Sequence, residues 1–232
     1  MPQLVCLPGL LCTPGIFDPV LAALGRGRAV EVPPLDSFEA MVDHLAAGLT
    51  EPAVLMGMSM GSYLALALAQ RVPEQVAGLI LIGTNAAADT PKGAALRGKV
   101  AAWAAREGMA ALAETIADTM LAQARRDDPA LRGAIRDMAE TTGLATFAAH
   151  QGALAGRPDQ TAGLAGIGCP VLVLTGAEDS VTPPDAGRAV AEGVADGRLV
   201  LLDGVGHMPV LECPDLVAGH IRDFLDMRVE AA

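Results

Sequence analysis

Six short apolar runs, separated by longer amphipathic stretches, restrict the fold of this sequence more than any other feature. They cover residues 3–7, 28–32, 53–56, 78–82, 171–175 and 199–202. The runs are continuously apolar rather than alternating, which is typical of parallel strands covered by helices on both faces. Strands that alternate with helices favour right-handed crossover connections. The pattern predicts an α/β fold with a doubly wound, mostly or wholly parallel six-stranded sheet.

The stretches between the runs carry signals for helix starts and stops. Asp36, followed by Glu39 three residues later, predicts a capping box. Pro73 ends one predicted helix, and prolines precede the last two. These signals predict helices over residues 40–49, 63–71, 185–192 and 216–227.

Residues 86–163 break this alternation. They contain no strand-like run, but alanine-rich helical stretches interrupted by Pro91, Gly108, Gly143 and Gly156. Asp128 followed by a proline is a further local start signal, with the aspartate as the N-cap. We therefore expect a helical lid of three or four short helices over 86–163, inserted into a core formed by residues 1–85 and 164–232.

Composition excludes several classes of function. The chain has 232 residues and a net charge of −11, with no basic cluster, so a nucleic acid or an anionic membrane surface would repel it. No apolar stretch reaches the roughly 18 residues that span a bilayer. The first residues lack the basic region of a signal peptide. We expect a cytoplasmic protein without nucleic-acid or membrane partners, and its oligomeric state stays open.

The cysteines argue against a metal site. The chain has four, at positions 6, 12, 169 and 213, without a Cys-x-x-Cys pair or suitably spaced histidines. Reduced thiols are expected, with no metal and no cofactor.

A serine between two glycines marks the first candidate for chemistry. Gly57-Met58-Ser59-Met60-Gly61 follows the run 53–56 and leads into helix-forming residues. A sharp turn from strand to helix strains the serine and requires neighbours without bulky side chains. The helix that begins there directs free N–H groups at the site, which favours developing negative charge. The context predicts that Ser59 is a nucleophile.

A serine nucleophile needs a base, and one histidine is suitably placed. His207 follows the last predicted strand, on a loop at the carboxyl edge of the sheet, where sites form in open parallel sheets. The other histidines, at positions 44, 150 and 220, fall in predicted helices or in the insertion and are expected to be surface or core residues.

The acid is expected at the end of the run 171–175. Asp179 is the first choice to orient the imidazole, and Glu178 is the second. Asp203 lies too close to the strand that carries the histidine loop, and Asp185 belongs to a helix start. The resulting order Ser, Asp, His along the chain is that of one hydrolase fold and differs from two other triads.

An oxyanion hole completes the expected machinery. One donor is the backbone N–H of the residue after the nucleophile, Met60. The second is expected in the loop after the first strand, and the N–H of Leu10 is the candidate.

Taken together, the elbow at 57–61, the acid loop at 176–179 and Gly206-His207 resemble the α/β-hydrolase superfamily. The resemblance covers about residues 2–85 and 165–228. It implies Ser59, Asp179 and His207 as the triad, and a fold that lacks the family's first two strands, the antiparallel hairpin. Two features depart from the family: Pro8-Gly9 replaces the usual His-Gly after the first strand, and the loop 32–36 is short.

The resulting hypothesis is a serine hydrolase that cleaves a small or medium carboxylic ester, thioester or lactone through an acyl-enzyme on Ser59. Its partner is a small-molecule acyl substrate. Apolar side chains of the lid and loops are candidates for an acyl pocket, although methionines and aromatics at helical spacing usually pack in a core. The pocket candidates are Leu11, Trp103, Phe147 and Met208, with Met109 and Met120 as further possibilities.

Two alternatives remain open. Similar folds use the same triad in lyases and carbon–carbon bond hydrolases, whose substrates carry a carboxylate. An inward-facing lid arginine would favour that reading, and the candidates are Arg97, Arg106, Arg125 and Arg126. The second alternative is a non-catalytic small-molecule receptor on the same fold, for which a complete triad has no purpose.

Overall fold

The computed structural model describes residues 2–229, and within them the strands form one six-stranded sheet. All neighbouring strands are parallel, in the order β2-β1-β3-β4-β5-β6. The strands are β1 (Gln3–Leu7), β2 (Arg28–Ala29), β3 (Ala53–Met58), β4 (Val76–Ile82), β5 (Val171–Gly176) and β6 (Gly197–Leu202). The doubly wound parallel sheet predicted from the apolar runs is confirmed.

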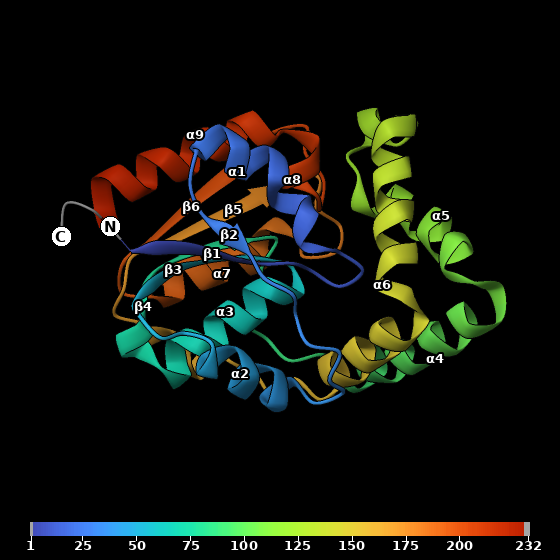
Figure 1. Cartoon of the computed structure of the whole chain (residues 1–232), viewed down its shortest axis with the longest axis horizontal. Helices are drawn as coiled ribbons and strands as arrows, with labels where there is room; N and C mark the ends of the chain where they lie inside the picture. Colours follow the sequence, from blue (N-terminus) through green and yellow to red (C-terminus); the bar gives the residue numbers. More distant parts are fainter. Residues whose placement is uncertain (1, 230–232) are drawn as a thin grey trace.

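Helices cover both faces of the sheet (Figure 1). One face carries α1 (Asp18–Leu24), α8 (Pro209–Glu212) and α9 (Pro214–Phe224), and the other carries α2 (Phe38–Ala47), α3 (Met60–Arg71) and α7 (Pro184–Gly193). Alternate strand residues therefore enter different cores: Val54 and Met56 pack on the α1 and α9 side, and Ala53 and Leu55 on the α3 side. Because both faces are buried, the strands read as continuous apolar runs.

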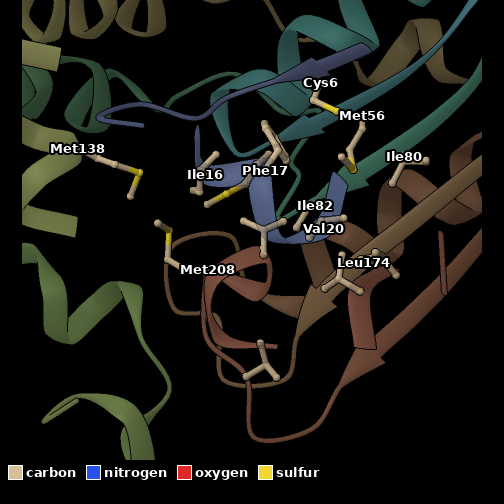
Figure 2. Packing of buried hydrophobic residues seen from close by; sticks show 14 of the residues in the cluster. Cys6, Ile16, Phe17, Val20, Met56, Ile80, Ile82, Met138, Leu174 and Met208 are labelled. Carbon is tan, nitrogen blue, oxygen red and sulfur yellow. The ribbon is translucent and has the colours of Figure 1, made fainter. Parts of the chain in front are cut away.

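The first of these cores extends beyond the sheet. Figure 2 shows Phe17 and Val20 of the first helical segment among strand side chains such as Met56 and Ile82. The same cluster continues to Met208, after β6, and to Met138, which belongs to the helices at the right of Figure 1. The space beyond the carboxyl edge of the sheet is therefore walled by apolar side chains.

The helices at the right of Figure 1 lie between β4 and β5 in the sequence and stand beside the carboxyl edge of the sheet. They are α4 (Pro91–Glu107), α5 (Met109–Met120) and α6 (Pro129–Ala155), and we call residues 86–163, which contain them, the helical insertion. No strand occurs in this segment, all of which the structure describes. A separate domain boundary at 86 and 163 stays a prediction.

The punctuating residues of the insertion mark its helix ends. Pro91 begins α4, Gly108 separates α4 from α5, and the Asp128 carboxylate accepts the N–H of Ala130 at 2.9 Å as the N-cap of α6. Gly143 adopts φ 71° inside α6 and breaks it into two halves. The prediction of short helices was wrong for α4, which has 17 residues, whereas the 27 residues of α6 are divided by the kink at Gly143 into two shorter helices.

Two local predictions were wrong in detail. Ser37, not Asp36, caps α2, because Ser37 has extended backbone angles and its hydroxyl oxygen accepts the N–H of Ala40 at 3.3 Å. The strand predicted over 28–32 is only β2, at the edge of the sheet. Val30 still donates to Cys6 at 3.0 Å, but Pro33 and Pro34 follow, and proline has no N–H to continue a ladder.

In the described part of the chain, no helix is both long and apolar enough to cross a membrane. Among the same residues, no three His, Cys, Asp or Glu side chains are grouped as a metal site would need. All four cysteines are free thiols. Burial raises the pKa of Cys6 and of Cys12 to about 12, so both stay protonated.

Candidate active site

Ser59 lies at the sharp turn between β3 and α3. Its φ is 50° and its ψ is −118°, a backbone conformation that residues other than glycine rarely adopt. The Ser59 N–H donates to the carbonyl oxygen of Ile82 on β4 at 2.8 Å, which ties the turn to the sheet. Such a conformation costs about 1–3 kcal/mol and persists only where the surroundings enforce it.

The two glycines of the motif permit a close approach of three chain segments. A Cβ atom on Gly57 would lie 2.3 Å from the carbonyl oxygen of Gly61. A Cβ on Gly61 would lie 1.9 Å from the carbonyl oxygen of Leu7, at the end of β1. Any larger residue at either position would push the serine away from the sheet edge.

His207 lies on the loop after β6 and contacts Asp179 on the loop after β5. Nδ1 of the imidazole is 2.8 Å from Oδ2 of the carboxylate, and both residues are buried. The structure thus brings together the two side chains expected from the strand ends. Glu178, the second choice for the acid, is exposed, and its carboxylate instead accepts the N–H of Gln123 in the helical insertion at 2.8 Å.

A short turn after Asp179 fixes its carboxylate. Oδ1 accepts the N–H groups of Val181 and Thr182, each at 2.9 Å. Oδ2 accepts the Thr182 hydroxyl at 2.8 Å in addition to facing His207. Burial alone would raise the pKa of Asp179, but the hydrogen bond and charge of His207 and the contacts from Thr182 outweigh it and hold the pKa below its ordinary value. Asp179 is therefore ionised at neutral pH.

A tyrosine that the sequence did not reveal as a site residue lies one helical turn after the nucleophile. The Tyr63 side chain lines the same cavity as Ser59. The guanidinium of Arg157 stacks 4.2 Å from the centre of the Tyr63 ring. Burial raises the pKa of Tyr63 despite the two nearby arginines, Arg157 and Arg97, so the phenol stays protonated.

Ser59 and His207 both line a cavity of about 200 Å³ beneath the helical insertion. Its wall is mainly apolar, and ten of its nineteen lining residues come from the insertion, which therefore forms much of the enclosure. Leu11, Phe147 and Met208 line it as expected, and so does Met120. The insertion's apolar contribution is Val100, Leu112, Ile116, Met120, Ile135, Met138, Phe147 and Leu154.

Trp103 does not line this cavity, so the prediction that it is a pocket residue was wrong. It is half-buried and packs against the hydrophobic cluster between the insertion and the core, as does Met109. The packing role that methionines and aromatics usually have applies to these two.

The loop after β1 closes the cavity from the nucleophile's side. Leu10 and Leu11 line it, and Leu11 has a φ of 62° in a turn closed by a 3.1 Å hydrogen bond from the Cys12 N–H to the Gly9 carbonyl. A Cβ on Gly9 would lie 3.3 Å from the Ser59 Cβ, so this loop passes directly beside the elbow. Met60 is the first residue of α3, where backbone N–H groups have no partner within the helix.

Of the four arginines considered, only Arg97 lines the cavity. Its guanidinium is already engaged, because Nε and Nη2 donate to both carboxylate oxygens of Asp89, the longer contact at 3.2 Å, and Nη1 donates to Gln151 at 3.0 Å. Arg106 and Arg126 are exposed, and Arg125 is half-buried outside the cavity.

The remaining histidines lie away from the cavity. His44 is on α2 and His220 on α9. His150 is buried in the second half of α6, where its Nε2 lies 3.0 Å from the carbonyl oxygen of Pro33. Burial lowers the pKa of His150.

Comparison with known proteins places this chain in a family. The model of a family described as serine aminopeptidase, S33, matches residues 34–214, which is more than half of the chain. The chain belongs to this family of α/β hydrolases. The fold found here, a parallel sheet with Ser59 at the strand-to-helix turn, is the one the resemblance implied.

Two of the similar proteins are esterases of the same kind. A pimeloyl-[acyl-carrier protein] methyl ester esterase of Aromatoleum aromaticum is 32% identical, with 96% of this chain and 97% of that protein covered. One from Neisseria meningitidis serogroup C is also 32% identical, over 87% of this chain and 80% of that protein.

Two solved structures of α/β hydrolases are also similar. A thermophilic esterase from Thermogutta terrifontis has a TM-score of 0.89 and 30% identity, covering 97% of this chain and 90% of that one. An enol-lactonase from Burkholderia xenovorans LB400 has a TM-score of 0.84 and 25% identity, covering 97% and 91%. The protein is therefore an enzyme, an α/β hydrolase of the carboxylesterase or lactonase type that acts on acyl compounds.

Proposed function

We propose that Ser59, His207 and Asp179 form the catalytic triad of this esterase. The observation that carries the proposal is the buried contact of 2.8 Å between His207 and Asp179 on the wall of the cavity that also holds the strained Ser59. An imidazole whose Nδ1–H donates to a buried carboxylate keeps Nε2 available to accept a proton from a serine hydroxyl.

The proposed reaction has two halves. In the first, the Ser59 hydroxyl attacks the acyl carbonyl while His207 takes its proton, and the collapse of the tetrahedral intermediate releases the alcohol, thiol or ring oxygen with that proton. In the second, water attacks the acyl-enzyme, His207 takes and returns a proton, and the carboxylic acid leaves. Ser59 is restored at the end of the cycle.

The N–H groups of Leu10 and Met60 would stabilise the oxyanion. Leu10 lines the cavity on the loop that passes beside the elbow, and Met60 presents a free N–H at the start of α3. One such donor is worth about 3–4 kcal/mol of transition-state stabilisation. The neighbouring position 8 holds a proline, so the loop takes its shape from the turn at Gly9–Cys12 rather than from a side-chain donor.

The insertion acts in this proposal as a lid over the acyl group. Its apolar lining residues suit a hydrocarbon chain of small or medium length, and the cavity volume of about 200 Å³ limits the size of that chain. The relatives named above hydrolyse the methyl ester of a pimeloyl chain on acyl-carrier protein. For this chain we propose a carboxylic ester with a medium-length acyl group, in the cytoplasm, with neither nucleic acid nor membrane as a partner.

Labelling with a fluorophosphonate probe tests the triad directly. We expect one modified residue per chain, located at Ser59 by peptide mass spectrometry, and no labelling of Ser59→Ala. Cys12 lines the same cavity, so Cys12→Ala is the matched control and should be labelled as the wild type is. Labelling at another serine would overturn the nucleophile assignment.

A carbon–carbon bond hydrolase or lyase is the second candidate, favoured by the position of Arg97 in the cavity wall. The bidentate contact with Asp89 weakens this reading, because a substrate carboxylate would have to compete with an ion pair already formed. A screen of esters, thioesters, lactones and vinylogous diketones separates the two candidates. Turnover of diketones but not esters would favour the second.

A further inference from the structure

A buried carboxylate outside the triad is attached to the histidine loop. Glu212 lies at the end of α8, is 3% exposed and does not line the cavity. Its Oε1 accepts the N–H of Gly206 at 2.9 Å and that of Met208 at 3.3 Å. One oxygen thus holds the backbone on both sides of His207.

The second oxygen of Glu212 reaches the helical insertion. Oε2 accepts the N–H of Ala122 at 2.9 Å, just after α5. The N–H of His207 itself donates to the carbonyl oxygen of Met120 at 2.9 Å. Three consecutive N–H groups, at positions 206, 207 and 208, are therefore bound by Glu212 or by the insertion.

The approach of the two segments is close. A Cβ atom on Gly206 would lie 2.5 Å from the Ala122 nitrogen and 2.6 Å from the Leu121 carbonyl carbon. The adjoining acid loop is tied to the same segment, because the Ser180 hydroxyl donates to the carbonyl oxygen of Thr119 at 3.3 Å. The end of α5 and the residues after it thus contact both loops that carry the acid and the base.

A carboxylate in this position is costly to bury. Burial raises the pKa of Glu212, and the backbone N–H groups of Ala122, Gly206 and Met208 partly offset that rise. Loss of the carboxylate would leave these N–H groups buried without an acceptor, which a structure avoids. The arrangement is therefore a specific one in which the loop and the insertion share a single acceptor group.

We propose that Glu212 is a positioning residue for His207, which sets the imidazole against Asp179 and Ser59 and couples its position to the end of α5. The inference rests on the proposed role of His207 as the base. Glu212 touches neither the cavity nor the imidazole ring, so it acts only through the backbone of residues 206–208. A displacement of the lid at Met120–Ala122 would in this arrangement move the base with it.

Glu212→Gln and Glu212→Ala separate the two oxygens. Glutamine keeps one carbonyl oxygen for the Gly206 and Met208 N–H groups and turns an NH₂ group toward the Ala122 N–H, so only the contact of residue 212 with Ala122 is lost. Alanine removes all three contacts. Glu178→Gln is the matched control, because Glu178 also accepts an N–H from the insertion, at Gln123, but does not bind the histidine loop.

The readouts are kcat and KM for a p-nitrophenyl ester, the pH profile of kcat/KM, and the thermal midpoint. Because misplacement of a catalytic group by about 1 Å can cost ~10²-fold in rate, we expect kcat to fall about 10-fold in Glu212→Gln and ~10²-fold in Glu212→Ala. KM should stay within a factor of about three, and the acid limb of the profile should move. Glu178→Gln should keep the wild-type kcat and pH profile.

A purely structural role would lower the thermal midpoint of Glu212→Gln and leave its kcat and pH profile unchanged, and that result would overturn the inference. An equal loss of kcat in Glu178→Gln would also overturn it. That result would mean that any contact with the insertion affects kcat, whether or not it binds the histidine loop. If Glu212→Ala does not fold, Glu212→Gln alone carries the test. Ser59→Ala is assayed in parallel. Full activity of Ser59→Ala would overturn the triad itself. If Ser59→Ala is inactive and Glu212→Gln is unaffected, only the positioning role is overturned.

Discussion

Nδ1 of His207 lies 2.8 Å from Oδ2 of Asp179, and the two side chains are 3% and 0% exposed. A buried acceptor at this distance leaves the imidazole one neutral tautomer, with hydrogen on Nδ1. Asparagine could present its amide NH₂ group to Nδ1 and favour the opposite tautomer.

We therefore expect Asp179→Asn to lower kcat by about 10⁴-fold, the size of this effect in a comparable triad. Stopped-flow assays with an activated ester measure it. Glu178→Gln, one residue away and directed at the insertion, serves as the control and should keep its activity. A fall of less than tenfold in Asp179→Asn would contradict the role of this carboxylate.

The depressed pKa of Asp179 has a consequence for stability. The group binds its proton more weakly in the folded than in the unfolded protein, so its stabilising contribution is present above the unfolded pKa of about 3.9 and is lost as the pH falls through the folded pKa. We expect the free energy of unfolding of the wild type, relative to Asp179→Asn, to decline as the pH drops below about 4. Urea unfolding at a series of pH values measures it, and a difference that grows on acidification would have the wrong sign.

The positive φ of Ser59 predicts that replacement by glycine abolishes activity but relieves backbone strain. Glycine adopts φ near 50° without steric strain, whereas alanine keeps the strain and loses the hydroxyl. Both Ser59→Gly and Ser59→Ala should be inactive toward esters. Ser59→Gly should be more stable than Ser59→Ala by about 1 kcal/mol, measured by chemical denaturation. Equal stabilities would show that the elbow is not strained.

The cavity wall predicts how acyl-chain preference can be changed. Met138 of α6 and Met208 both line the cavity, and Figure 2 shows their side chains pointing toward each other from opposite sides. Met138→Ala should enlarge the cavity and raise kcat/KM for longer acyl chains relative to acetate and butyrate esters. Its cost in stability should be near the lower end of the 2–5 kcal/mol typical of buried methionines, because Met138 is 9% exposed.

Trp103→Ala is the matched control for this experiment. Trp103 belongs to the same insertion and packs against the same cluster, but it does not line the cavity. Its replacement should lower stability without changing the order of preference among p-nitrophenyl esters from acetate to decanoate. A shift of chain-length preference in Trp103→Ala, with none in Met138→Ala, would refute the assignment of the cavity as the acyl pocket.

The parts of the site that were foreseen are those fixed by topology. Ser59, Asp179 and His207 follow β3, β5 and β6, and a parallel sheet brings the carboxyl ends of its strands to one edge. Residue types known to perform the chemistry, each just after the carboxyl end of a strand, could therefore be chosen before any distance was known. Their catalytic roles stay a proposal.

The residues that were missed act through contacts that the local sequence does not specify. Glu212 binds the N–H of Ala122, 90 residues away, and nothing near Glu212 in the sequence indicates that partner. Thr182 could have been found, because an aspartate two and three residues before backbone N–H groups favours a local turn. Asp36 and Ser37 are equally good caps by residue type, and only the structure shows that Ser37 immediately precedes the first residue of α2.

The position of the insertion in the sheet has a consequence for how such enzymes diversify. The insertion follows the carboxyl end of β4, and its own two ends lie side by side, because the Gln160 N–H donates to the carbonyl oxygen of Ala86 at 2.9 Å. A segment with this geometry can be exchanged between relatives through two crossovers without altering strand order. The non-covalent junction at Thr119–Gln123 must match the recipient's loops. Chimaeras that carry this junction with the transplanted helices should acquire the donor's choice of acyl group and keep the recipient's chemistry.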